Sequence, residues 1–337
     1  MSAATAMPGW LASMIGLGQL LLVGLVLSLT LVTWITIHRL RHPPRRTYSW
    51  AVARSLPGDP SELDEPREYE TIDITLPGLS TRGWIIPGDA PDGPLIVCTP
   101  GWGDSKIGIL PRLDALAPYA SRIIAWDPPG HAEASGAWDF GLRTAPMLLE
   151  IIRSLRASDT ERVILFGWSM GAGVSIAAAA RDATDNTALI SGVIAEAPYA
   201  MPWTPAYRVL HLSGLPWRIN GPIAFGLLGI MHGVGPRWRG MKNGLPAFDR
   251  AQLAARLTCP LHIIHTDTDE VCPIEDARAI AATAPDASLT VIHNGTHNTL
   301  WTNPETRSQC IEAVGEFLNR HPTTVPPLRA ATPADRP

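Results

Sequence analysis

Residues 165–173, "LFGWSMGAG", place Ser169 between two glycines, Gly167 and Gly171, each two positions away. The apolar residues before Ser169 are typical of a β-strand, and the small residues after it are typical of a helix. Where a strand turns into a helix within one residue, a side chain two positions from the turn would collide with the backbone. The pattern therefore predicts a sharp turn that exposes the Ser169 hydroxyl and directs the positive end of the next helix toward it.

Strands and helices alternate on both sides of this turn. Apolar strands are expected at residues 69–78, 81–88, 94–101, 122–130, 162–169, 191–200, 260–267 and 288–295. Helices are expected at residues 106–120, 145–156, 171–181, 274–284 and 304–320. Such alternation implies an α/β fold with a largely parallel sheet, helices on both faces, and reactive groups at the carboxyl ends of the strands.

The N-terminal region has a different character, because residues 10–37 contain no charged side chain. A bilayer core requires about 20 such residues. No Lys or Arg precedes this stretch, as one would in a secretory signal, so we expect residues 1–40 to be a retained, single-pass transmembrane anchor. The alternative is a buried helix of a soluble core, but such helices seldom run this long without a polar face. Basic residues follow at Arg39, Arg41, Arg45 and Arg46, which favours a cytoplasmic catalytic domain at the cell membrane.

Composition sets the remaining boundaries. Prolines and mixed charges predict a linker with little structure at residues 41–66 and a disordered tail at 322–337, which leaves a domain at residues 67–321. The net charge of −4 gives no indication of a nucleic-acid partner. The four cysteines form no CxxC pair, and neither an HExxH motif nor a phosphate-binding glycine loop is present. We therefore expect no metal and no cofactor.

With its GxSxG motif at residues 167–171 and the turn "DPPGHAEASG" at 127–136, the chain resembles the α/β-hydrolase family over residues 68–320. The resemblance is to the branch of serine esterases, monoacylglycerol lipases and serine aminopeptidase-like enzymes. It implies an eight-stranded, mostly parallel sheet, a helical lid inserted at about residues 200–248, and a serine nucleophile that needs no cofactor. It also implies a catalytic triad in the chain order Ser, Asp, His.

The resemblance assigns the triad partners of Ser169. Asp269, in "HIIHTDTDEVCPIEDA", matches the family's acid after a late strand; Asp267 and Glu196 are alternatives, the latter at a position that some relatives use. His297, in "NGTHN", matches the catalytic base in the following loop, whereas His293 is expected within or at the end of its strand. The acid would hold the imidazole in one tautomer and stabilise its cation.

The oxyanion hole follows from the same resemblance. One backbone N–H should come from Met170, directly after the nucleophile, and the other from Trp102 in "TPGWGD", which is similar to the family's HGxG motif. The sequence departs from that motif at Pro100, which replaces the usual histidine. Backbone donors require no particular side chain.

The insertion at residues 200–248 indicates the substrate. It is rich in Trp, Phe and Met, holds five basic residues and no acidic residue, and is expected to form a lid with an apolar inner side. We hypothesise that the basic lid and the basic segment after the anchor face an anionic leaflet, where each positive charge contributes about 1 kcal/mol. The expected function is a membrane-anchored serine hydrolase acting on small-molecule or lipid esters. The alternatives are a non-catalytic binding protein, or a peptidase, thioesterase or acyltransferase of the same fold.

Overall fold

The computed structural model describes residues 8–214, 216–233 and 248–320 of the chain. Its centre is one sheet with the strand order β1-β2-β4-β3-β5-β6-β7-β8. β2 pairs antiparallel with β1 and β4, and the other neighbours pair in parallel, which confirms the predicted sheet. The strands are β1 (Glu70–Leu76), β2 (Leu79–Pro87), β3 (Leu95–Thr99), β4 (Arg122–Trp126), β5 (Val163–Trp168), β6 (Gly192–Glu196), β7 (Leu261–Thr266) and β8 (Ala287–Ile292).

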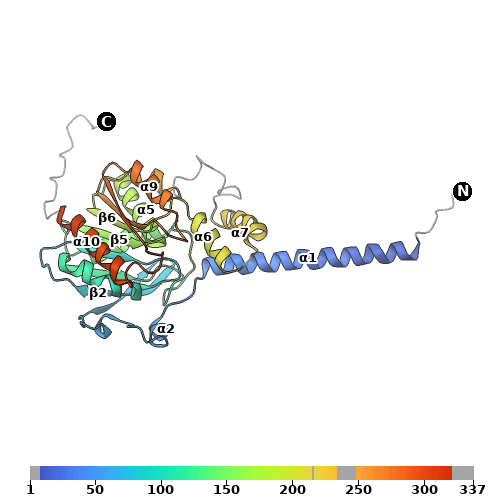
Figure 1. Cartoon of the computed structure of the whole chain (residues 1–337), viewed down its shortest axis with the longest axis horizontal. Coiled ribbons are helices and arrows are strands. Elements are labelled where there is room, and N and C mark those ends of the chain that lie inside the picture. The colour runs from blue at the N-terminus through green and yellow to red at the C-terminus, as the bar shows by residue number, and fades with distance from the viewer. Residues whose placement is uncertain (1–7, 215, 234–247, 321–337) are drawn as a thin grey trace.

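Helices cover both faces of the sheet (Figure 1). One buried apolar cluster joins the sheet to α4 (Thr144–Leu155), α5 (Met170–Asp185), α8 (Arg250–Ala254) and α9 (Ile274–Thr283). The second joins the opposite face to α3 (Leu113–Leu116) and α10 (Pro304–Arg320). The helix expected at residues 106–120 is broken, with 3-10 turns at Lys106–Arg112 and Ala117–Tyr119 on either side of α3, because Pro111 lacks the N–H that an α-helix requires.

Helix α1 (Gly9–Arg41) extends away from the domain (Figure 1). It is the one helix in the described part of the chain that is long and apolar enough to cross a membrane. Most of its large apolar side chains are exposed, but one side of its last turns is buried, at Thr33, Thr36 and Leu40. There α1 packs against α7 (Trp217–Met231), and the Asn220 amide donates a hydrogen bond to the Thr36 hydroxyl.

The expectation of an unstructured linker is wrong for most of residues 41–66. This segment contains α2 (Tyr48–Val52) and a 3-10 turn at Pro60–Glu62, in which the Asp59 side chain accepts the Ser61 N–H. Its arginines bind the domain: Arg45 donates to the Ala132 carbonyl at 2.8 Å, and Arg46 pairs with Asp104 at 3.2 Å. Composition could not predict this structure, because the residues that hold the segment in place lie far away in the sequence.

The insertion after β6 forms α6 (Trp203–Leu212) and α7. Three of its five basic residues, Arg237, Arg239 and Lys242, and the tail predicted at 322–337 lie outside the described residues. The described basic residues are Arg208 and Arg218.

His131, in the turn after β4, is fully buried, and burial lowers its pKa to about 4. The unfolded chain binds a proton near pH 6.5, whereas the folded protein does not, so the free energy of unfolding should fall as the pH drops from 6.5 toward 4. By pH 5 the loss from this group is about 2 kcal/mol. We expect a His131→Gln variant to lose about that much less than the parent between pH 7 and 5, measured by urea unfolding. An equal decrease in the free energy of unfolding of the two proteins between pH 7 and 5 would contradict the lowered pKa of His131.

Candidate active site

Ser169 occupies the turn between β5 and α5. Its backbone has φ 53° and ψ −113°, a conformation that L-residues rarely adopt. The flanking glycines explain why the turn can form. A Cβ on Gly167 would lie 2.3 Å from the Gly171 carbonyl oxygen, and one on Gly171 would lie 1.9 Å from the Thr99 carbonyl oxygen. The GxSxG pattern is thus a steric requirement of this turn, as the sequence predicts.

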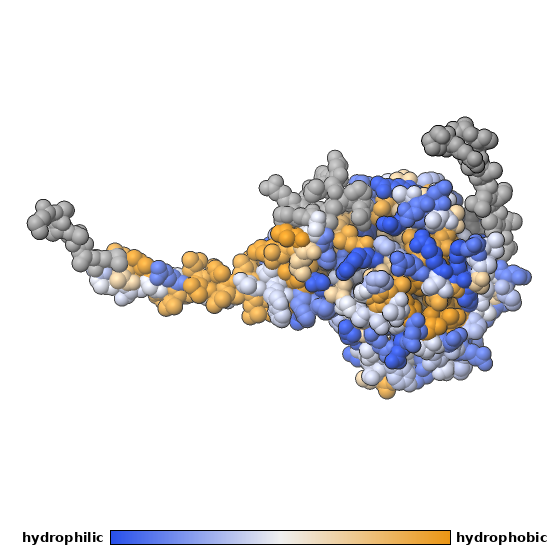
Figure 2. Space-filling view, turned by 180° about the vertical axis from the view of Figure 1, so that it is seen from behind, coloured by the Kyte–Doolittle hydropathy of each residue, from blue (hydrophilic) through white to orange (hydrophobic). Residues whose placement is uncertain are grey.

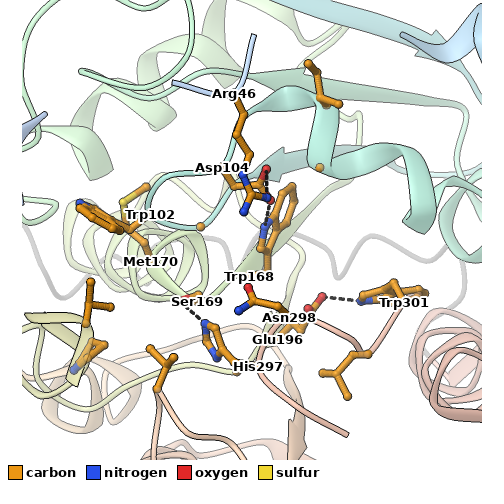
Figure 3. Close-up of a pocket in the computed structure, with 18 of the residues that line it drawn as sticks. Arg46, Trp102, Asp104, Trp168, Ser169, Met170, Glu196, His297, Asn298 and Trp301 are labelled. Atoms are coloured by element: carbon orange, nitrogen blue, oxygen red, sulfur yellow. Dashed lines mark hydrogen bonds and ion pairs between the residues drawn. The ribbon is translucent and has the colours of Figure 1, made fainter. Parts of the chain in front are cut away.

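His297, in the loop after β8, lies against Ser169. Its Nε2 is 3.0 Å from Ser169 Oγ, and its Nδ1 is 2.7 Å from Asp269 Oδ2 (Figure 3 shows the Ser169 contact). With the ring proton on Nδ1 directed at the carboxylate, Nε2 is free to accept the serine proton. The structure brings together the three residues that the sequence singled out.

Asp269 is fixed as well as buried. Its Oδ1 accepts the backbone N–H groups of Val271 at 2.8 Å and Cys272 at 2.6 Å, which leaves Oδ2 for His297. Burial alone would raise the pKa of this carboxyl. The hydrogen bond and charge of His297, together with the Cys272 amide, outweigh burial and lower the pKa below its ordinary value. Asp269 is therefore an anion at neutral pH, able to stabilise an imidazolium.

The alternative residues have other partners. Asp267 pairs with His293 through a 2.6 Å contact on the surface, directly beyond the end of β8. Glu196, at the end of β6, is buried and accepts Arg112 at 2.9 and 2.7 Å and the Trp301 indole at 2.7 Å. Its two oxygens are thus engaged in a structural ion pair.

Trp102 and Met170 line the same cavity as Ser169 and lie on one side of it (Figure 3). Met170 opens helix α5, where the backbone N–H has no partner within the helix. Their role as oxyanion donors stays a prediction, and this placement is compatible with it.

Asp269, Cys272 and His297 are the one group of His, Cys, Asp or Glu in the described ranges whose ligand atoms approach one another closely enough for a metal ion, within 4.8 Å. Burial raises the pKa of the Cys272 thiol well above its ordinary value, and the adjacent Asp269 charge raises it further. A metal would need the thiolate and would compete with Ser169 for His297. The expectation of no metal and no cofactor stays a prediction.

Ser169 opens into a cavity of about 710 Å³. The insertion contributes α6 side chains, including Ala206, Val209 and Leu212, and its role as a lid stays a prediction. The cavity has a second wall, which was not predicted from the sequence. Leu40, Arg46, Trp50, Leu56 and Leu63, all from the end of α1 or the segment after it, also line the cavity.

Comparisons with known proteins agree with this architecture. A family model described as "Alpha/beta hydrolase family" matches residues 96–307. The candidate carbamate hydrolase RutD of Escherichia coli O6:H1 is 25% identical over 244 residues, covering 66% of this chain and 88% of that protein. RutD of Variovorax paradoxus is 32% identical over 85 residues, 25% of this chain and 32% of that protein. Among solved structures, the esterase Pf2001 of Pyrococcus furiosus superposes with a TM-score of 0.59 at 20% identity, covering 84% of this chain and 98% of its own, a likeness of fold. The matched model, the sheet order and the turn at Ser169 together place this chain in the alpha/beta hydrolase family.

Proposed function

We propose that the protein hydrolyses carboxylic esters through an acyl-enzyme on Ser169. As Ser169 Oγ attacks the carbonyl carbon, His297 Nε2 takes the hydroxyl proton, and the carbonyl oxygen becomes an oxyanion held by the N–H groups of Trp102 and Met170. Collapse breaks the bond to the alcohol, which leaves with the proton from His297. Water then loses a proton to His297 and attacks the acyl carbon. As the acid is released, His297 returns the proton to Ser169 Oγ, which restores the hydroxyl. Asp269 stabilises the imidazolium in both halves of the reaction.

The observation that carries this proposal is the hydrogen-bonded chain from Asp269 through His297 to Ser169 at the floor of an apolar cavity. At about 710 Å³, the cavity is within the range of ligand sites that enclose drug-sized molecules. Its walls include apolar side chains at Leu40, Trp138, Phe140, Met170, Val209 and Leu212. This lining suits a lipid or long-chain acyl ester better than a small polar carbamate.

Two features of α1 support a membrane anchor rather than a core helix or a cleaved signal. Only 11% of its most apolar stretch is buried, whereas the core helix of a soluble protein is mostly buried. Its C-terminal end packs into the domain through Leu40, which also lines the cavity. Removal of the helix would therefore open the cavity. Thirty-three residues rise about 50 Å, more than the roughly 30 Å of a bilayer core. The basic residues at 39–46 then favour a domain on the cytoplasmic side of the cell membrane.

Helix α7 presents a second apolar surface beside this anchor (Figure 2). Its inner side, with Ala224, Phe225 and Leu228, is buried. Its outer side exposes large apolar side chains at Ile219, Ile223, Leu227 and Ile230, spaced as on one helix stripe. An apolar stripe next to a membrane-spanning helix is typical of an interfacial element. We infer that α7 lies in the headgroup region and that the cavity receives its substrate from the leaflet. The basic residues of the insertion, hypothesised above to face anionic lipid, would strengthen this contact.

The test uses the full chain in proteoliposomes with matched substrates: a long-chain monoacyl ester in the bilayer, a water-soluble butyrate ester, and the corresponding thioester, amide and carbamate. We expect ester cleavage, with kcat/KM for the long-chain ester at least about tenfold above that for butyrate, because the apolar cavity buries the chain. A preference for the carbamate or amide would reject the ester assignment.

The matched variant replaces Ile223, Leu227 and Ile230 of the exposed stripe with asparagine. Because these side chains face away from the core, the rate on soluble butyrate should be unchanged, whereas the rate on the bilayer substrate should fall severalfold. Equal rates for parent and variant on the bilayer substrate would exclude α7 from the membrane surface.

A further inference from the structure

The end of α1 is held by the loop that carries a predicted oxyanion donor. The last carbonyls of a helix have no partner within it. Here two of them are satisfied by the catalytic domain. The Trp102 indole N–H donates to the Leu40 carbonyl at 3.1 Å, and the Trp138 backbone N–H donates to the Arg41 carbonyl at 2.8 Å. The domain thus caps the anchor helix, and the anchor helix in turn holds the domain.

The oxyanion loop, residues 101–104, is a turn in which the Asp104 N–H donates to the Gly101 carbonyl at 3.1 Å. Glycines flank Trp102 on both sides, and Gly103 has φ 75°, so neither neighbour limits the backbone through a side chain. The indole tethers the loop at Trp102 itself, and the Asp104 side chain tethers the end of the loop. Because Trp102 is the expected source of the oxyanion N–H, fixing its side chain also fixes the donor.

A second link joins the same loop to the segment after α1. Arg46 Nη1 pairs with Asp104 Oδ1 at 3.2 Å, and Asp104 Oδ2 accepts the Trp168 indole at 2.9 Å (Figure 3). Trp168 directly precedes the nucleophile. The chain after the anchor is thereby connected to both the oxyanion loop and the turn at Ser169.

We propose that Trp102 is a positioning residue. Its indole, held by the Leu40 carbonyl, fixes the position of the oxyanion donor, so turnover depends on the contact between the end of the anchor helix and the domain. This inference rests on the proposed acyl transfer at Ser169. It concerns how the membrane helix takes part in catalysis, which anchoring alone does not require. A displacement of about 1 Å at a catalytic group can cost up to about a hundredfold in rate.

The principal test is Trp102→Phe in the full-length protein, which keeps an aromatic ring in the cavity wall and removes the N–H. We expect kcat to fall about tenfold with KM changed less than about threefold, because an oxyanion donor acts in the transition state. The affinity of a boronic acid inhibitor, whose tetrahedral adduct places an oxygen in the oxyanion hole, should fall in parallel. Trp10→Phe is the matched control, since Trp10 is an exposed residue at the opposite end of α1 from Leu40, and it should alter neither value.

A milder variant avoids the risk of misfolding. Arg46→Gln removes the pair with Asp104 from a side chain that is 39% exposed, and it should lower kcat by about two- to fivefold. Arg54→Gln is its control, because Arg54 stacks on Trp50 of the same segment. Arg54→Gln should leave kcat unchanged.

Amide hydrogen exchange gives a readout that needs no substrate. Residues 101–105 should exchange faster in Trp102→Phe than in the parent. The inference is overturned if kcat, inhibitor affinity and exchange rates all stay within twofold of the parent values. It is also overturned if KM alone rises, because the indole would then act only as part of the cavity wall. Absence of turnover in the parent would instead reject the proposed function, with the exchange result still deciding whether the anchor holds the loop.

Discussion

Replacement of Ser169 by alanine is expected to lower kcat for ester hydrolysis by about 10⁵- to 10⁶-fold, because the acyl-enzyme can no longer form. Alanine differs from serine by one oxygen, and the strained backbone of the turn is maintained by Gly167 and Gly171, which stay in place. The thermal midpoint should therefore change little. Initial rates on the preferred ester, with the enzyme concentration determined independently, measure the effect.

The control for this substitution is Ser175→Ala on α5, the helix that follows Ser169. Ser175 is fully buried, and its hydroxyl has no hydrogen-bond partner among the described residues. Its loss should leave kcat within about twofold of the parent. A Ser169→Ala protein that retained a tenth of the parent activity would show that another group performs the attack.

The second large effect is expected from Asp269→Asn, with kcat reduced by about 10⁴-fold. The asparagine oxygen can still accept the backbone N–H groups of Val271 and Cys272, so the loop should keep its shape. Its NH₂ group would then face His297 Nδ1, which favours the tautomer whose proton is on Nε2 and can no longer accept from Ser169. The loss should appear in kcat at neutral pH, with the thermal midpoint nearly unchanged.

Glu196→Gln separates the two possible acids. Because Glu196 holds the buried Arg112, its neutralisation should cost stability, on the order of 3 kcal/mol, while kcat of the folded enzyme falls less than about tenfold. Urea unfolding and kcat measured on the same preparations give both values. A larger loss of kcat in Glu196→Gln than in Asp269→Asn would transfer the role of the acid to Glu196.

The sequence predicted those parts of the molecule that depend on local chemistry. The two glycines around Ser169 follow from the crowding of a strand-to-helix turn, and the alternation of apolar runs follows from a sheet covered on both faces. Chain order alone left Asp267 and Asp269, and His293, His297 and His321, as possible partners of Ser169; His321 lies outside the described residues. The position of the end of β8 separates them, because His293 directly follows the strand and points to solvent, whereas His297 lies in the loop that returns over Ser169.

The wall that the N-terminal segment contributes to the cavity could not be predicted in the same way. Prolines and arginines at residues 43–46 are typical of a linker, and contacts with residues 58 and 87 positions away give the arginines a fixed place. No periodicity in the sequence reports such contacts. The Leu40 carbonyl is a further example, because a backbone acceptor is present at every residue and carries no sequence signal.

Covalent labelling tests the central claim most directly. The full-length protein is treated with a fluorophosphonate, and the modified peptide is identified by mass spectrometry in the parent, Ser169→Ala and Ser175→Ala proteins. The arrangement of Asp269, His297 and Ser169 predicts one phosphonylated residue, Ser169, in the parent and in Ser175→Ala, and no labelling in Ser169→Ala. Labelling at another residue, or no labelling of a folded parent protein, would contradict it.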